Sequence, residues 1–154
     1  GNDTLNGGNN SDRVYGDGGN DSLTGSSSYA DGALSYVSEW HAPAADSLYG
    51  GAGGDTLLLH QMDQAEGGSG ADHFIIECAA PGEAVAMITD FDGRSDRLEL
   101  DFLRSGWGTV PAGNVTAETD GTSGDVTILV NGQAVAVLRD PAAFDLTAVD
   151  VAMI

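Results

Sequence analysis

Lysine is absent from the 154-residue sequence, and only five arginines carry positive side chains, against 24 aspartates and glutamates. The formal net charge is -19. Nucleic acids and anionic membranes are bound through Lys and Arg, so this charge disfavours both as partners. Like charges in a compact state also oppose folding. The composition therefore predicts that cations are the natural partners of this chain.

Cysteine is nearly absent too, and several motifs are missing. The single Cys78 excludes an internal disulfide and is expected to be a buried thiol. No apolar run approaches the ~20 residues of a membrane-spanning helix. No signal peptide opens the chain, and its first residues fall inside a repeat unit, which is typical of a fragment of a longer protein. HExxH and GxSxG are absent, so we expect no catalysis, and His41, His60 and His73 are expected to be solvated or structural.

Glycine is abundant, with 23 residues, and it alternates with aspartate in a period of nine. Asp3, Asp12 and Asp21 each follow turn positions occupied by Gly, Asn or Asp, the nearest of which lies two residues earlier. Each is followed two residues later by Leu or Val. The pattern returns at Asp46, Asp55 and Asp72, and weaker units stand at Asp31 and Asp63. A flexible Gly/Asp/Ser linker would not need apolar residues at a fixed offset from aspartates, although it describes the expected chain without calcium.

Residues 26–45 break this pattern and are predicted to form a loop insertion that interrupts the stack of repeats. The insertion contains Tyr29, Tyr36 and Trp40. These aromatic side chains either pack against the repeats or provide a platform for a sugar or a partner.

A nine-residue unit has room for a glycine-rich turn of six residues and a strand of three, whose apolar residue points inward. Two units complete one coil, and stacked coils place their strands in parallel. Stacking also places aspartate over aspartate, for example Asp3 over Asp21, and unpaired carboxylates so close repel one another. Calcium resolves this conflict, because it accepts six to eight carboxylate and carbonyl oxygens and tolerates irregular geometry better than magnesium.

The repeats thus predict several calcium ions, held by turn residues and shared between successive coils. The candidate ligands are Gly1, Asp3, Gly8, Asn10, Asp12, Asp17, Gly19, Asp21, Asp46, Gly51, Gly53, Asp55, Asp63, Gly68, Gly70 and Asp72. A second candidate is the segment DFDGRSD, with Asp90, Asp92 and Asp96. It is either a separate calcium loop or a turn whose aspartates accept hydrogen bonds from their own backbone.

From residue 74 the glycine content falls, and FIIE, VAMITDF, DRLELDF, DVTILV and QAVAVLR are predicted as strands. Asn131-Gly132 predicts a hairpin between the last two. The tail is predicted to form one helical turn from Thr147, with Asp150 three residues on, before a last strand.

The segments GGAGGDTLL (50–58), GGSGADHFI (67–75) and GDGGNDSLT (16–24) are similar to the GGxGxDxUx nonapeptide of RTX proteins. The chain resembles the C-terminal part of these proteins. The passage from GGSGADHFIIE to ITDFDGRSDRLELDF resembles serralysin-type C-terminal domains and the R-modules of mannuronan C5-epimerases.

The resemblance implies an all-β fold, with a parallel β-roll over residues 1–78 and a β-rich cap over residues 79–154. It also implies a secreted, extracellular protein that folds on calcium outside the cell, exported by type I secretion machinery through an uncleaved C-terminal signal. The alternative is a polysaccharide-associated module of an extracellular enzyme such as an alginate epimerase. The negative charge argues against direct attraction of acidic polymers.

Overall fold

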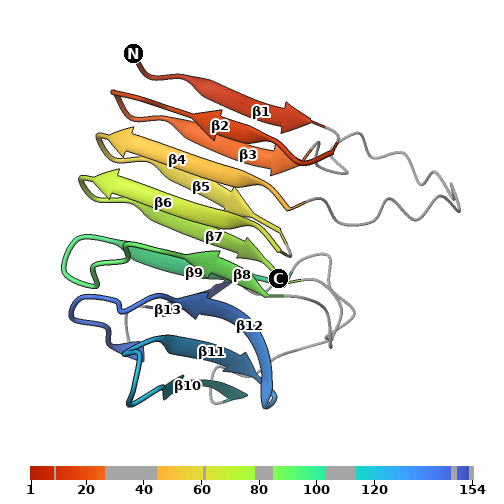
Figure 1. The fold of residues 1–154 in the computed structure, drawn as a ribbon, viewed down its shortest axis with the longest axis vertical. Helices are drawn as coiled ribbons and strands as arrows, with labels where there is room; N and C mark the ends of the chain where they lie inside the picture. Colours follow the sequence, from red (N-terminus) through yellow and green to blue (C-terminus); the bar gives the residue numbers. More distant parts are fainter. Residues whose placement is uncertain are drawn as a thin grey trace, which may run out of the picture.

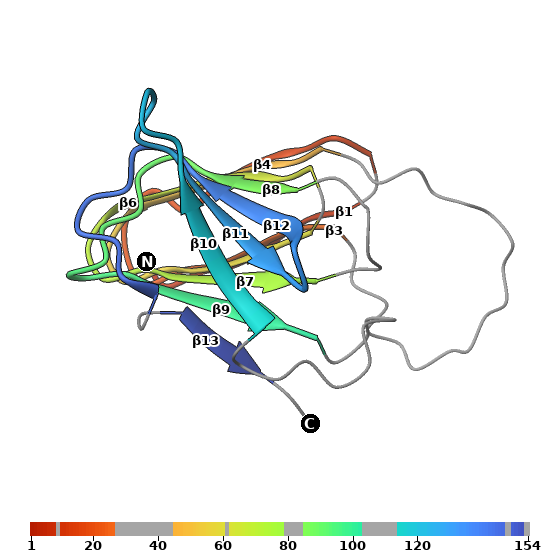
Figure 2. The same ribbon diagram turned by 90° about the horizontal axis from the view of Figure 1, so that it is seen from below.

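The computed structural model describes residues 1–8, 10–26, 45–60, 62–78, 85–102, 114–146 and 149–152. These residues form two β-sheets that face one another, with successive strands assigned to alternate sheets through most of the chain (Figures 1 and 2). The first sheet has the order β1 (Thr4–Gly8), β3 (Ser22–Ser26), β5 (Thr56–Leu59), β7 (His73–Glu77), β9 (Arg97–Asp101) and β13 (Val149–Ala152). The second has the order β10 (Val115–Thr119), β11 (Val126–Val130), β12 (Gln133–Leu138), β8 (Ala86–Ile88), β6 (Gln64–Ser69), β4 (Ser47–Ala52) and β2 (Arg13–Tyr15).

Parallel pairing dominates both sheets, which confirms the predicted all-β parallel roll. The coils stack along the long axis of the molecule from β1 to the β10–β11 end (Figure 1). Parallel pairing continues beyond residue 78, because β9 pairs with β7 and β8 with β6. The domain boundary predicted at residue 78 stays a prediction.

The core lies between the sheets and includes the apolar residue two positions after each described repeat aspartate from Asp12 to Asp72. In the first sheet the ladder Leu23, Leu57, Phe74 and Leu98 is in register and at most 2% exposed. In the second sheet Val14, Leu48, Ala65 and Ile88 form the equivalent ladder. Pleat alternation explains both ladders, since residues on either side of each apolar position face outward.

The strands predicted after residue 74 correspond to β7, β8, β9, β11 and β12. The hairpin at Asn131-Gly132 joins β11 and β12 in antiparallel pairing, and both residues have positive φ (51° and 78°), as a tight hairpin turn requires. Among the described residues, no helix has the length and apolarity to cross a membrane.

Two predictions about connections are wrong. The stack is not interrupted by the insertion, because β3 pairs directly with β5 and Ser22 lies opposite Thr56, on the other side of the insertion in the sequence. Asp150 is not part of a helical turn; it lies in β13, which is the predicted last strand, opposite Glu99, and its carboxylate pairs with Arg97. Thr147 and residues 27–44, with Asp31 and the three predicted aromatic residues, lie outside the described residues.

Candidate calcium-binding turns

The repeat aspartates stand directly before strands and form two rows, one in the turns that enter each sheet. The first aspartate row precedes β1, β3, β5, β7 and β9 and consists of Asp3, Asp21, Asp55, Asp72 and Asp96. The second aspartate row precedes β2, β4 and β6 and consists of Asp12, Asp46 and Asp63. The strict offset between acid and apolar residue therefore places every carboxylate at the same point of its coil.

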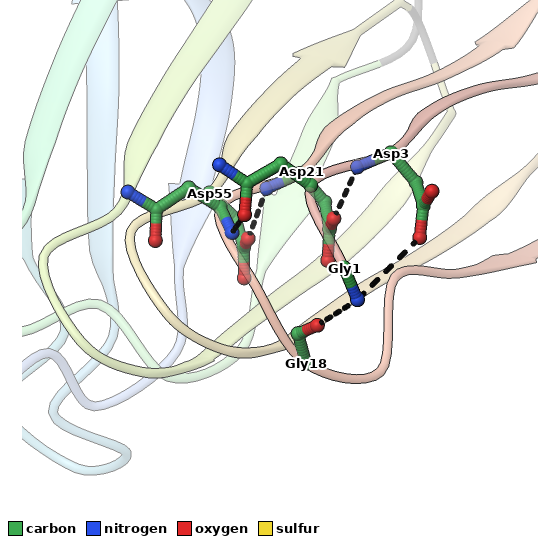
Figure 3. Close-up of polar contacts among 7 residues, drawn as sticks. Gly1, Asp3, Gly18, Asp21 and Asp55 are labelled. Atoms are coloured by element: carbon green, nitrogen blue, oxygen red, sulfur yellow. Dashed lines mark hydrogen bonds and ion pairs between the residues drawn. The ribbon is translucent and has the colours of Figure 1, made fainter.

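Within the first row, each aspartate donates its backbone N–H to Oδ1 of the aspartate one coil later. The N–O distances are 2.8 Å from Asp3 to Asp21, 2.8 Å from Asp21 to Asp55, 2.9 Å from Asp55 to Asp72 and 3.1 Å from Asp72 to Asp96. Figure 3 shows the first three aspartates of this row, with the dashed bonds running from one coil to the next. Carboxylate oxygens that accept backbone N–H groups satisfy the turn and fix the side-chain direction.

The second row repeats this arrangement across the insertion. The N–H of Asp12 donates to Oδ1 of Asp46 (2.7 Å), and the N–H of Asp46 donates to Oδ1 of Asp63 (3.0 Å). Asp12 thus finds its partner beyond the insertion instead of at Ala30, where an uninterrupted repeat would place it.

Both rows contain carboxylate oxygens that are buried and unpartnered. Asp21, Asp46 and Asp55 are at most 3% exposed. In Asp12, Asp21, Asp46 and Asp55 the second oxygen, Oδ2, is buried and has no hydrogen-bond partner. A buried charge without a counter-charge is strongly unfavourable. These four oxygens therefore fit a bound cation, and their hardness fits calcium.

The turns also bring backbone carbonyls close to successive coils. Gly53 and Gly70 have φ of 139° and 145°, and a Cβ at either would lie 1.6 Å and 1.7 Å from the carbonyl oxygens of Gly19 and Gly53. Only glycine fits such a position. Asn10 and Asp17, which replace glycine in two turns, have φ of 76° and 65°, as expected for residues that tolerate the left-handed region.

Side-chain ligands alone do not make a metal centre here. Among the described residues, no three His, Cys, Asp or Glu side chains gather as a ligand set. The remaining oxygens would come from the glycine-rich turns, where the candidates Gly1, Gly8, Gly19, Gly51, Gly53, Gly68 and Gly70 stand. Calcium accepts such carbonyls readily.

The electrostatics of the rows favour proton uptake in the absence of a cation. Burial raises the pKa of Asp72 to about 6, and the carboxylates of Asp96, Asp55 and Asp90 add to this effect, although a backbone hydrogen bond from Asp55 opposes it. Burial likewise raises the pKa of Asp46, with Asp63 and Asp12 contributing. The charged form of these carboxylates is therefore unfavourable unless something positive is close.

In the segment from Asp90 to Asp96 the carboxylates accept backbone hydrogen bonds, and the separate calcium loop stays a prediction. Asp90 accepts from the N–H groups of Gly67 (2.9 Å) and Gly68 (2.7 Å). Oδ2 of Asp96 accepts from the N–H of Asp92, whose Oδ1 accepts from the N–H of Arg94. Sequence reasoning missed that Asp90 and Asp96 reach the preceding coil.

The described histidines pair with carboxylates. His60 Nε2 lies 3.1 Å from Glu77 Oε2, and His73 Nε2 lies 3.1 Å from Glu99 Oε2. The neighbouring carboxylates of Asp63 and Glu77 raise the pKa of His60 to about 9. His60 directly follows β5 and His73 begins β7, and these ion pairs agree with the structural role predicted for both, whereas His41 lies outside the described residues.

Cys78 is buried, as predicted, at 3% exposure. Burial raises the pKa of its thiol to about 12, with smaller contributions from Asp101 and Glu77. A thiol with such a pKa is protonated at neutral pH and is a poor nucleophile.

A stacked aromatic pair at the surface, one ring exposed and one half-buried, escaped sequence reasoning. Tyr15 of β2 and Tyr49 of β4 are in register and stack with ring centroids 4.8 Å apart and an interplanar angle of 7°. Tyr15 is 55% exposed. The two residues share the same offset from Asp12 and Asp46, a signal hidden by the intervening insertion.

Comparison with known proteins agrees with this geometry. The family model described as RTX calcium-binding nonapeptide repeat matches residues 1–27 and 44–59, in four copies. The chain therefore contains RTX calcium-binding repeats, arranged as a parallel β-roll. Such repeats are typical of secreted bacterial proteins.

Two solved structures are similar to the whole chain in fold. The solution structure of the AlgE6R2 subunit of a mannuronan C5-epimerase from Azotobacter vinelandii has a TM-score of 0.58 and 20% identity; the match covers 97% of this chain and 91% of that one. The AlgE6R3 subunit from the same organism has a TM-score of 0.55 and 21% identity, with 93% and 78% covered. No curated protein sequence matches the chain.

Proposed function

We propose that this chain is a calcium-binding module that folds when calcium ions occupy the turns between successive coils, and that it has no catalytic activity of its own. The observation that carries the proposal is the set of four buried, unpartnered Oδ2 atoms in the aspartate rows. Each is an acceptor without a donor in a chain with only five basic side chains. Calcium supplies the missing positive charge and stabilises the roll by mass action.

The ligands follow from the two rows and the turns beside them. Asp21 and Asp55 offer free oxygens in the first row, and Asp12 and Asp46 do so in the second. The glycine turns of successive coils pack closely, and the backbone carbonyl oxygens of one coil lie nearest the next coil at Gly53 and Gly70. This packing supports backbone oxygens as the remaining ligands. Calcium would neutralise the carboxylates and hold adjacent coils together.

The decisive experiment is far-UV circular dichroism of the chain in chelator, then in millimolar calcium, with magnesium as the control. We expect a coil-like spectrum in chelator that becomes β-type with calcium only. A complete β spectrum in chelator would contradict the folding switch and leave the buried carboxylates without this explanation.

We further propose that the protein acts outside the cell after export through type I machinery, which recognises its C-terminal region. The RTX repeats support this proposal, because they are typical of secreted bacterial proteins. Residues 79–154 contain both partners of the β8–β12 and β9–β13 pairs, so they make a sensible fusion segment. A passenger fused to this segment should be exported from a bacterium with a compatible system. Retention inside the cell, while a known RTX tail exports the same passenger, would contradict the proposal.

A role in polysaccharide association is the second candidate. It is supported by the exposed Tyr15, which stacks on the half-buried Tyr49, and by the fold shared with epimerase subunits. Exposed aromatic rings suit apolar faces of sugars. A glycan array in calcium tests it, with Tyr15→Ala as the control variant; an array without any ligand would remove its support.

A further inference from the structure

The turn between β5 and β6, His60 to Asp63, differs in composition from the glycine-rich turns of the roll. It contains no glycine, whereas the next turn along the chain, ahead of Asp72, reads GGSGAD. Met62 occupies the left-handed region with φ of 69°, a conformation unusual for such a side chain. The turn therefore lacks the glycine backbone that lets carbonyl oxygens approach an ion elsewhere in the roll.

The carboxylate of Asp63 also differs from those of its row. Its Oδ1 accepts from the N–H of Asp46 at 3.0 Å, and its Oδ2 accepts from the N–H of His60 at 2.8 Å. By contrast, Asp12 and Asp46 in the same row each keep a buried Oδ2 without a partner. Asp63 is 0% exposed, yet its polar atoms are satisfied within the protein.

The side chain of His60 lies between two carboxylates. Nδ1 is 3.7 Å from Oδ2 of Asp63, and Nε2 is 3.1 Å from Oε2 of Glu77. An imidazole ring thus lies beside Oδ2 of Asp63, whereas Oδ2 of Asp12 and of Asp46 has no hydrogen-bond partner. Two backbone hydrogen bonds and the nearby imidazole perform here what a cation would perform in the other turns.

We infer that the His60–Asp63 turn closes on itself and binds no calcium, so that the second aspartate row carries its ions only up to Asp46. This inference rests on the proposed calcium-binding function, and it removes Asp63 from the ligands expected from the sequence. The chain then has a metal-free turn in the middle of an otherwise metal-dependent stack.

Counting bound calcium ions by native mass spectrometry at saturating calcium tests the inference. Asp63→Asn and Asp55→Asn are matched variants, because both replace a buried aspartate whose Oδ1 accepts a backbone N–H. We expect Asp63→Asn to retain the wild-type number of ions and Asp55→Asn to bind at least one fewer. An equal loss of ions in both variants would overturn the inference, whereas a wild-type chain that binds no calcium would refute the proposed function instead.

A second variant is needed in case Asp63→Asn misfolds, because the new side-chain amide group could place a donor against the backbone N–H of His60. Residues 60–62 are replaced by the GGSGA segment that precedes Asp72. We expect this folded graft to bind one more calcium ion than the wild type. An unchanged count would overturn the inference, because an ion would then already occupy the native turn.

Discussion

Asp55→Asn should destabilise the fold in calcium, but it should stabilise the fold or leave it unchanged in chelator. Asp55 is 1% exposed, and its Oδ1 accepts the N–H of Asp21 at 2.8 Å. Its Oδ2 is buried and has no partner. Asparagine retains an oxygen for the N–H and removes the charge. In chelator the substitution therefore relieves an uncompensated buried charge and should stabilise the fold or leave it unchanged.

In calcium the same substitution removes a ligand. An ion that binds only the folded state stabilises it by about 2.7 kcal/mol when its free concentration is 100 times Kd. Loss of one ion at such a concentration should therefore cost Asp55→Asn about 2.7 kcal/mol relative to wild type, which is roughly a hundredfold change in the folding equilibrium.

Urea denaturation in calcium measures how much stability Asp55→Asn loses. In chelator, folding induced by an excluded osmolyte measures whether the variant is as stable as the wild type or more stable, since osmolytes favour the compact state. Asp55→Asn should fold at the same or a lower osmolyte concentration than the wild type. A cost of similar size in both solvents would refute the reasoning, because Asp55 would then be only a hydrogen-bond acceptor for the turn.

Three further outcomes follow from the geometry. Leu57→Ala should destabilise the calcium-loaded fold by about 2–5 kcal/mol in urea denaturation, because Leu57 is 0% exposed. Leu58→Ala, on the outward face of the same strand, should cost far less. Equal costs for the two variants would contradict the inward-facing ladder. Gly53→Ala should weaken calcium binding in a titration followed by circular dichroism, because its Cβ would lie 1.6 Å from a carbonyl oxygen, whereas Gly18→Ala, with open space around it, should not. In chelator, acidification should stabilise the fold, because the folded-state pKa of Asp72, about 6, exceeds its ordinary value of 3.8; this contribution is complete below about pH 4 and is lost as the pH rises through about 6. A pH series in chelator with no gain of β signal on acidification would contradict it.

Much of the roll could be predicted from the sequence, because the turn residues and the buried apolar residues recur at a fixed distance from each other. The offset between Asp21 and Leu23 recurs at Asp55 and Leu57, and it predicted both the aspartate row and the inward ladder. Here local conformation and core packing favour the same structure, so pattern and fold agree.

The errors concern partners that are distant in the sequence. Nothing local reveals that Asp46 replaces Ala30 as the partner of Asp12, since that depends on where the chain re-enters the stack. The hydrogen bonds from Gly67 and Gly68 to Asp90 were hidden for the same reason. The tail was predicted as a helical turn that leads into a last strand; the strand is present as β13, but it already includes Asp150, because parallel pairing with β9 begins at Val149.

The ladders continue across the insertion, so the pairing of the strands does not depend on how many residues connect them. Thr4 lies opposite Ser22, and Ser22 lies opposite Thr56 with the same parallel pairing, although the second connection includes the whole insertion. Closing a flexible loop costs conformational entropy that grows only logarithmically, by about 0.6 kcal/mol for each doubling of its length. The connection between β3 and β4 is thus a position where foreign sequence of considerable length can be carried at small cost, which makes this roll a natural scaffold for displaying an inserted peptide.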